Sequence, residues 1–372
     1  MAQAPEKFHS LFERGSVSIQ LRLAPTPQIV ALLKQTVWGT KGSRYTHLHI
    51  QERINQQLQP YFVTLEKSGE LLAVICVSYR VLQVGERKVN GYYVRYFAFN
   101  SKLQTQDENQ AGQKKQGFFR SFMMRLFQQP LGKLPLNYGE DLSLSSVYYA
   151  YVDVKNVRSA AFIKLMGFED VGSFDTGLFT RFNPKKQDIE HLSFQELRKL
   201  HGPAIEAPQY AFYSQEFEGE NQGGFALTKN GKTLVACRVS KALWKVESTG
   251  SKVEDYIIKQ LQIIPALKKA FDPERFSFLV YDYLYASDEA TREDLISLFE
   301  GVLKQFDYRF GMYFIDEKDK LSDLLSVSKG SGLIASSIGS HKGGLVAQWT
   351  KGSEAPKDWD DLPWFFHALD AT

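Results

Sequence analysis

The stretch that decides the fold lies near the middle of the chain and reads VDVKNVRSAAFIKLMGF from Val152 to Phe168. Its first residues are apolar in the manner of a buried strand. Asn156 favours a helix start, because its side chain can accept a backbone N–H that has no partner in the first turn. Residues 157–166 are expected to form that helix, and Gly167 supplies its left-handed stop. The stretch therefore predicts a strand, a capped helix and a returning strand that begins at Phe168.

The segments around this stretch predict an α+β (mixed α/β) protein with a mostly antiparallel sheet flanked by helices. Hydrophobic periodicity and turn residues define the elements of this half. The expected strands cover residues 17–23, 61–66, 71–84, 88–100, 145–154 and 168–181, and the expected helices cover residues 27–36, 47–58, 118–128 and 157–166.

The order of strand, Asn, helix and Gly-Phe resembles the signature of the GCN5-related N-acetyltransferase (GNAT) superfamily, and the resemblance covers about residues 60–180. It implies a fold that binds acetyl-CoA as cosubstrate. It also implies that Asn156, and Phe99 on the neighbouring strand, bind the pantetheine arm. An ordinary capped helix between two strands is the alternative, and a CoA site can be built on such a helix.

A second motif opens the helix expected at residues 118–128. GNAT proteins have Arg/Gln-x-x-Gly-x-Gly/Ala at this place, where backbone N–H groups at a helix start bind the CoA pyrophosphate. Here the sequence departs from the pattern at Lys114 and at Phe119, whose ring would crowd a phosphate, while Gly117 fits the central glycine. A solvated helix end with two lysines is the alternative. The expected cofactor-binding residues of this motif are Lys114, Lys115, Gln116, Gly117, Phe118, Phe119 and Arg120.

The resemblance also directs attention to the proton that leaves the amine. Many GNAT enzymes carry a Tyr near the middle of the second helix, and this sequence has Ile163 there, which cannot donate a proton. Tyr151 and Asp153, on the strand before that helix, are the candidate catalytic residues. The same strand and the strand that follows the helix contain three further candidates for proton transfer, Tyr148, Tyr149 and Glu169. A structural role is the alternative for each of them.

Two sequence echoes predict a duplicated domain. The turn and strand that begin at Gly69 recur 162 residues later at Gly231, and residues 151–156 recur with a shift of 163 at residues 314–319. Chance recurrence of short strand patterns is the alternative. The polar stretch around Pro184 predicts the boundary, so residues 1–185 are expected to form the acetyl-CoA-binding GNAT-like domain and residues 186–372 a degenerate GNAT-like domain.

The second copy is not expected to bind CoA. After a strand expected at residues 276–285, four acidic residues and no glycine occupy residues 286–294, before the helix expected at 295–306. Acidic residues suit a helix start but repel pyrophosphate. Asp319 stands where the first copy has Asn156. This half is expected to wall the substrate cleft or to stabilise the first domain.

Composition narrows the classes of function. The chain has 372 residues, a formal net charge of +3 and two cysteines, with aromatic residues at 13%. No block of like charges indicates a nucleic-acid partner or a lipid surface, and no stretch is long enough to span a membrane. Cys76 and Cys237 lie in apolar runs typical of free, buried thiols, which indicates a cytoplasmic protein.

Three further patterns in the sequence give weaker evidence about function. His47 and His49 are too close in sequence to share a metal ion on a helix. The glycine-rich residues 329–344 lack the ending of a phosphate-binding loop. The aromatic residues 359–366 are expected to dock on this same chain.

The leading hypothesis is an N-acetyltransferase that transfers an acetyl group from acetyl-CoA to a primary amine of a small molecule or a peptide, in the cleft between the halves. The alternative is a non-catalytic acyl-CoA or small-molecule binding protein, which Phe119 and Ile163 motivate. A third hypothesis is peptide or aminoacyl transfer on a related tandem fold. The near-neutral charge speaks against a tRNA partner.

Overall fold

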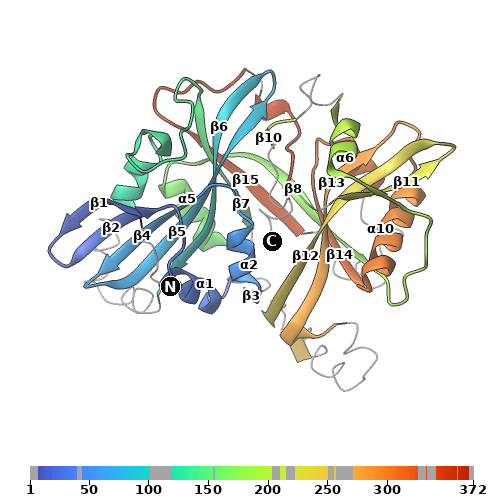
Figure 1. Ribbon diagram of the computed structural model, residues 1–372, viewed down its shortest axis with the longest axis horizontal. Helices are drawn as coiled ribbons and strands as arrows, with labels where there is room; N and C mark the ends of the chain where they lie inside the picture. The colour runs from blue at the N-terminus through green and yellow to red at the C-terminus, as the bar shows by residue number, and fades with distance from the viewer. Residues whose placement is uncertain are drawn as a thin grey trace.

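The chain folds around one large, mostly antiparallel sheet with helices on its faces, an α+β architecture (Figure 1). The computed structural model describes residues 7–39, 44–100, 119–153, 156–202, 210–214, 223–249, 255–256, 271–325, 332, 341–357 and 359–367. Within them the sheet has 15 strands. Their main order is β1-β2-β4-β5-β6-β7-β15-β8-β14-β13-β12-β11-β9.

The first half of the chain contributes the six strands expected from its sequence and two more, β1 and β3. Its strands are β1 (Phe8–Arg14), β2 (Val17–Arg22), β3 (Arg44–His47), β4 (Pro60–Lys67), β5 (Glu70–Val84), β6 (Arg87–Phe99), β7 (Ser146–Asp153) and β8 (Glu169–Thr180). Its helices are α1 (Pro27–Gln35), α2 (Ile50–Asn55), a helix over residues 119–126, the short η2 (Leu131–Lys133) and α5 (Val157–Leu165).

The second half repeats much of this order. Its strands are β9 (Glu190–Leu192), β10 (Tyr213–Ser214), β11 (Gly224–Lys229), β12 (Lys232–Ser248), β13 (Phe276–Ala286), β14 (Phe310–Asp316) and β15 (His341–Trp349). Its helices are α6 (Phe194–Leu200), η3 (Pro273–Arg275), α10 (Arg292–Phe306), α11 (Leu321–Leu325) and η4 (Trp359–Asp361).

One expected helix is wrong over half of its length. Residues 47–58 were expected to be helical, but α2 covers only Ile50–Asn55, and His47 ends strand β3. The reason is tertiary: β3 pairs with β12 of the second half, with His47 opposite Trp244. Pairing with a distant strand overrides the local helical spacing.

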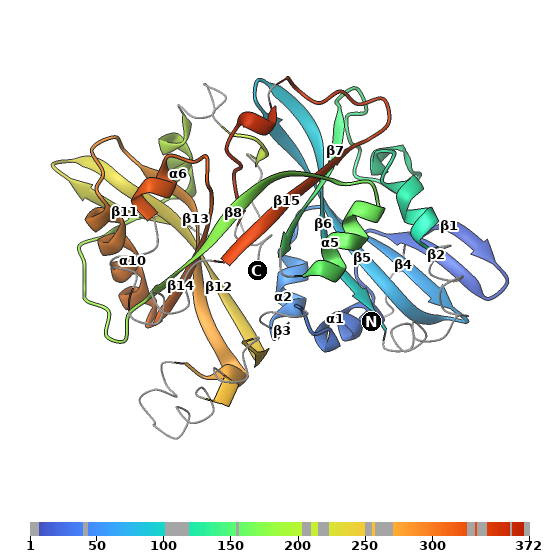
Figure 2. The same ribbon diagram turned by 180° about the vertical axis from the view of Figure 1, so that it is seen from behind.

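The two halves exchange their last strands. β8 follows β7 in sequence but pairs with β14, whereas β15 follows β14 but pairs with β7, and β8 and β15 pair with each other. Figures 1 and 2 show β8 and β15 side by side between the two halves. Neither half therefore closes its sheet alone.

The halves also match in local detail. Ser68 and Gly69 both have positive φ angles in the turn before β5, as do Asn230 and Gly231 before β12. Each turn begins a strand whose antiparallel pairing with the next strand in sequence contains a bulge. The division of the chain near residue 185 and the duplication stay predictions, which this correspondence supports.

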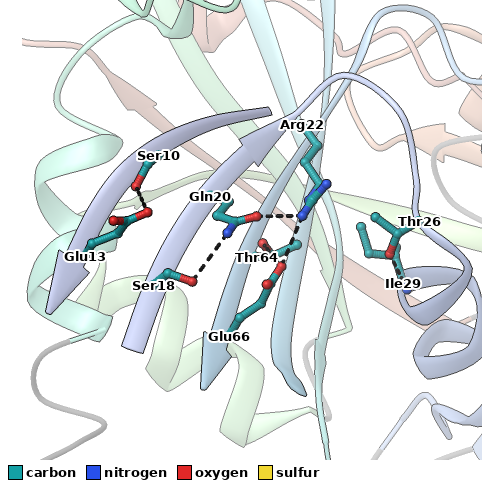
Figure 3. Close-up of polar contacts among 9 residues, drawn as sticks. All are labelled: Ser10, Glu13, Ser18, Gln20, Arg22, Thr26, Ile29, Thr64 and Glu66. Atoms are coloured by element: carbon teal, nitrogen blue, oxygen red, sulfur yellow. Dashed lines mark hydrogen bonds and ion pairs between the residues drawn. The ribbon is translucent and has the colours of Figure 1, made fainter. Parts of the chain in front are cut away.

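Polar side chains cover one face of the outer strands of the first half (Figure 3). Arg22 donates a 2.6 Å hydrogen bond to Gln20 and lies 3.5 Å from the carboxylate of Glu66, which also accepts from Thr64. The opposite face packs Ile19 and Leu21 into the core. This alternation, with a period of two, fixes the register of the outer hairpin.

The core has three large parts. One lies in the first half beneath α5 and the helix over residues 119–126, a second lies in the second half beneath α10, and a third joins the two halves. Both cysteines are buried thiols outside any disulfide in the described structure, as expected.

Candidate functional site

Strands β6 and β7 separate from each other partway along their length. They pair in parallel only from Asn90–Tyr93 with Ser146–Tyr149, although β6 continues to Phe99 and β7 to Asp153. Beyond this point each strand presents an edge whose backbone groups do not pair across the opening. Such an edge can bind an extended, amide-containing ligand through main-chain hydrogen bonds.

A β-bulge in β6 lies beside this opening. Val74 pairs with Ala98 and Cys76 with Arg95, so that Tyr96 and its neighbour together face a single residue of β5. Tyr96 has a φ angle of 50°, which is uncommon for a bulky residue. A bulge leaves its extra residue outside the ladder. The bulge therefore interrupts the regular ladder between β5 and β6 beside the opening.

Helix α5 begins at the open end of β7, as the sequence predicts. The Asn156 side chain accepts the backbone N–H of Ser159 at 3.1 Å, which caps the helix. Gly167, with a φ angle of 97°, ends it. Phe162 of α5 packs on Phe97 of β6 with ring centroids 4.4 Å apart. The strand–helix signature thus surrounds the opening.

The second predicted motif is described only in part. Lys114, Lys115, Gln116, Gly117 and Phe118 lie outside the described residues. The other two residues, Phe119 and Arg120, begin the described part of the helix over residues 119–126. Arg120 is exposed, and the Phe119 side chain is buried in the core of the first half. The effect of Phe119 on a phosphate at this helix stays a prediction, because the residues before Phe119 lie outside the described part of the chain.

Phe99 and the two candidate catalytic residues line the two sides of the opening. Phe99 is the last residue of β6, and its ring centroid lies 4.4 Å from that of Phe97. Tyr151 and Asp153 lie on β7, two residues apart and hence on one face. Tyr151 is half-buried, and its ring centroid lies 5.2 Å from that of Tyr93 on β6. Asp153 is exposed.

Residues that the sequence analysis missed gather near the bulge. Tyr45 of β3 stacks on Trp244 of β12 with centroids 3.9 Å apart, and His47 packs edge-on against both rings. Arg95 lies over the Tyr96 ring at 4.3 Å. Only the pairing of β3 with β12 brings these groups together, so no local sequence signal could have revealed them.

The charges near this group act on its titratable side chains. Burial lowers the pKa of His47 well below its usual range, and Arg95 and Arg53 lower it further. Burial raises the pKa of Tyr45 to about 12, against a lowering effect of Arg95. His47 is therefore neutral at neutral pH, and both a positive charge, on Arg95, and a negative charge, on Asp153, act on Tyr45.

The matching place in the second half is closed. β13 and β14 also pair over a short stretch and then separate, and β13 bulges at Tyr283 with a φ angle of 50°. There Arg238 forms a buried, bidentate ion pair with Asp282. A neutralised pair offers no net charge to a ligand.

The helix start of the second half is occupied by its own side chains. Thr291 and Asp294 form a capping box at the start of α10, in which each side chain accepts the backbone N–H of the other. Glu293 adds a further negative charge in the first turn. These acidic groups interact favourably with the positive end of the helix dipole, and they would repel a phosphate group.

No known family model matches the sequence, and no curated protein matches it either. Solved structures do match. N-myristoyltransferase of Saccharomyces cerevisiae with bound myristoyl-CoA matches with a TM-score of 0.52 and 9% identity, over 92% of this chain and 85% of that chain. A GCN5-related N-acetyltransferase of Kribbella flavida has a TM-score of 0.45 and 11% identity, over 90% and 72%. A probable N-acyltransferase of Enterococcus faecalis has 0.43 and 9%, over 82% of this chain and only 66% of that protein.

The chain therefore shares the mixed α+β fold of the N-myristoyltransferase structure. At these identities the likeness concerns the fold alone. In the part of the chain that the structure describes, every helix is too short or too polar to cross a bilayer.

Proposed function

We propose that this protein is an acyl-CoA-dependent N-acyltransferase that transfers an acetyl group from acetyl-CoA to a primary amine. One observation carries the proposal: β6 and β7 separate beside a bulge, and a capped helix begins at the open end. The opening offers unpaired strand edges for a pantetheine arm. The fold shared with a structure that contains myristoyl-CoA supports an acyl-CoA ligand.

The residues present fit such a ligand. Phe97, Phe99 and Phe162 form an apolar wall on one side of the opening. The N-terminal amides of the helix that includes Phe119 and Arg120 would bind the pyrophosphate together with Lys114 and Lys115. Asn156 caps α5 at the open end and would contact the pantetheine arm.

The chain supplies positioning and electrostatics to the reaction. Acetyl-CoA brings the acetyl group as a thioester; the amine forms the new C–N bond, the C–S bond breaks, and one proton passes from the amine to the leaving sulfur. The bulge at Tyr96 would donate a backbone N–H to the carbonyl oxygen, where negative charge develops in the transition state. Fixed donors of this kind need no reorganisation during the reaction.

The proton needs side chains that the fold places near the opening. Asp153, exposed at the end of β7, would accept the proton of the incoming amine. Tyr151, on the same face, would deliver a proton to the sulfur. Ile163 packs at the edge of the first-half core, so the helix position that carries a Tyr in many GNAT enzymes supplies no acid here.

Rings beside the bulge support a short acyl chain. Trp38, Tyr45, His47 and Tyr96 contact one another on the side of the sheet to which the acyl group would point. Adding a long chain there would require these rings to move. The amine, on a small molecule or a peptide, would enter between the halves past Tyr45 and Trp244, in the cytoplasm.

The first experiment is calorimetric titration of acetyl-CoA into the wild-type protein, Gly117→Asp and Arg292→Asp. The first variant places a carboxylate at the proposed pyrophosphate site, and the second places one at the start of α10. Binding by the wild type and Arg292→Asp, with loss in Gly117→Asp, is the expected result. Equal binding by all three proteins would place the ligand elsewhere, and no wild-type binding up to about 1 mM, a free energy of about −4 kcal/mol, would overturn the proposal.

A non-catalytic acyl-CoA binding protein is the second candidate, because Ile163 leaves the helix without a proton donor. The two candidates differ in turnover. A panel of primary amines with a thiol-reactive dye reports CoA release, and mass spectrometry reports the acetylated amine. Turnover of any amine favours the transferase, and binding without turnover favours the second candidate.

A further inference from the structure

Residues 359–367 form an aromatic segment that is buried within the same chain, as the sequence analysis expected. We call Trp359–His367 the aromatic segment. Its larger side chains are all less than 10% exposed, namely Trp359, Trp364, Phe365, Phe366 and His367. A segment this apolar and this buried contributes to the core between the two halves rather than to the surface.

The second half holds the backbone of the aromatic segment. The N–H of Trp364 donates to the buried carboxylate of Asp316, at the end of β14, at 3.1 Å. Ala211 donates to the carbonyl of Pro363 at 2.8 Å and accepts from the N–H of Phe365 at 3.0 Å. These three bonds fix the path of the chain on either side of Trp364.

Successive side chains of the segment point into different cores. Phe365 packs among residues of the second half, with its ring centroid 4.7 Å from that of Tyr283. Phe366 belongs instead to the core that joins the halves. Its ring centroid lies 5.3 Å from that of Tyr151 and 4.9 Å from that of Phe174.

His367 fixes the far end of the segment. Its Nδ1 atom lies 3.1 Å from the hydroxyl of Tyr283, at the bulge of β13. Phe366 is therefore held between two anchors of the second half, one at Asp316 and one at Tyr283. These contacts fix the backbone on both sides of Phe366.

We infer that Phe366 is a positioning residue for acyl transfer: it holds the Tyr151 ring beside the opening between β6 and β7. The inference rests on the proposed function, in which Tyr151 delivers a proton. Tyr93 and Phe174 contact two further sides of the Tyr151 ring, so Phe366 completes its enclosure. Aromatic contacts of this geometry favour one orientation of the ring.

The arrangement gives the second half a role in the reaction. The proposed acyl-CoA site belongs to the first half. The second half holds the segment that orients a side chain of that first half. Displacing a proton donor by about 1 Å can lower a rate by about a hundredfold. The packing of Phe366 is therefore expected to affect turnover more than acyl-CoA binding.

The first test does not depend on activity. 3-Fluorotyrosine is introduced at position 151, and its ¹⁹F resonance is recorded in the otherwise unchanged protein, in Phe366→Ala and in Phe365→Ala. The resonance is expected to shift and broaden in Phe366→Ala and to stay in place in Phe365→Ala. Equal spectra for the two variants would overturn the inference. If either variant fails to fold, Phe366→Leu and Phe365→Leu replace the pair.

The second test uses turnover and acetyl-CoA affinity. Phe366→Ala is expected to lower kcat by about tenfold to a hundredfold, with the dissociation constant of acetyl-CoA within about twofold of wild type. Phe365→Ala, equally buried, controls for lost packing and is expected to keep kcat per folded molecule. In a Tyr151→Phe background, Phe366→Ala should add less than about a twofold loss, because coupled residues are not additive.

Either of two results would overturn the positioning role. One is an undiminished loss of kcat for Phe366→Ala in the Tyr151→Phe background. The other is an equal loss of kcat in Phe365→Ala and Phe366→Ala. Failure of the proposed function looks different. In that case the wild type turns over no amine, while the ¹⁹F spectra still decide whether Phe366 orients Tyr151.

Discussion

The two halves of this protein carry the same bulge but place different charges beside it. In the first half Cys76 pairs with Arg95 next to the bulge. At the same register in the second half Arg238 pairs with Asp282, and the two side chains form a buried ion pair. The residue opposite Arg95 in the first half is thus the uncharged Cys76, whereas the residue opposite Arg238 in the second half is a carboxylate that neutralises it.

The strand ends differ in the same sense. Asp153 at the end of β7 is exposed, while its counterpart Asp316 at the end of β14 is buried and accepts the backbone N–H groups of Lys318 and Trp364. The second opening is thus closed by the chain's own groups. The two halves share a strand arrangement, and in the proposed function only the first half offers an open ligand site.

The largest expected effect concerns the buried ion pair. Asp282→Ala leaves the Arg238 guanidinium buried without its carboxylate, which is expected to lower the free energy of unfolding by about 3–5 kcal/mol. Arg95→Met in the first half is expected to cost less, because it leaves no buried carboxylate behind. Urea unfolding followed by tryptophan fluorescence measures both, and a larger loss in Arg95→Met would contradict the comparison.

A smaller effect is expected at the strand ends. Asp316→Ala removes the acceptor of two backbone N–H groups in the interior, at a cost of about 1–3 kcal/mol. Asp153→Ala changes an exposed side chain, so its effect on stability should stay within about 0.5 kcal/mol. Thermal unfolding compares the pair. Equal losses would mean that Asp153 also accepts structural hydrogen bonds.

Most of the fold of the first half could be predicted from the sequence, because its elements are defined locally. The strands over residues 60–99 alternate or run apolar, and Asn156 and Gly167 mark the two ends of α5 by their own chemistry. The repeat shift of 162 residues relates Val74 of β5 to Ala236 of β12. Each lies directly before the bulge in the pairing of its strand with the next strand. These features were sufficient to predict the mixed α+β fold.

Features that depend on distant pairing could not be predicted. The exchange of β8 and β15, the pairing of β3 with β12 and the contact of Phe366 with Tyr151 each join residues far apart in sequence. At the site, the capping role of Asn156 was predictable, but the burial of Phe119 was not. The direction of that ring is set by the core it meets, which a single local motif does not encode.

Acid is expected to weaken the contact between the halves. Burial lowers the pKa of His367 well below its usual range, and the nearby Arg80 and Arg238 lower it further. The unfolded chain therefore binds the proton more tightly, so this contribution to stability is present above about pH 6.5 and is lost as the pH falls below it, by up to about 1.4 kcal/mol per pH unit.

His367→Gln removes this dependence. The difference in unfolding free energy between wild type and His367→Gln, measured by urea at pH 7.5 and again near pH 5.5, isolates His367. This separation matters because burial raises the pKa of Asp316, and that group contributes in the opposite direction: its destabilisation is relieved as the pH falls through its raised pKa. A difference that does not change with pH would exclude His367 as the titrating group.

The smallest expected effect tests whether the residue at position 156 explains why only the first half is proposed to bind acetyl-CoA. Asn156→Ala removes the cap of α5 and should cost about 1 kcal/mol of stability. Asn156→Asp keeps the cap and copies Asp319, so its stability should stay within about 0.5 kcal/mol of wild type. The added carboxylate at the open end of β7 should nevertheless weaken acetyl-CoA binding by its negative charge. If Asn156→Asp binds acetyl-CoA as the wild type does, the charge at this position does not distinguish the two halves, and the difference lies at the helix over residues 119–126 and at α10.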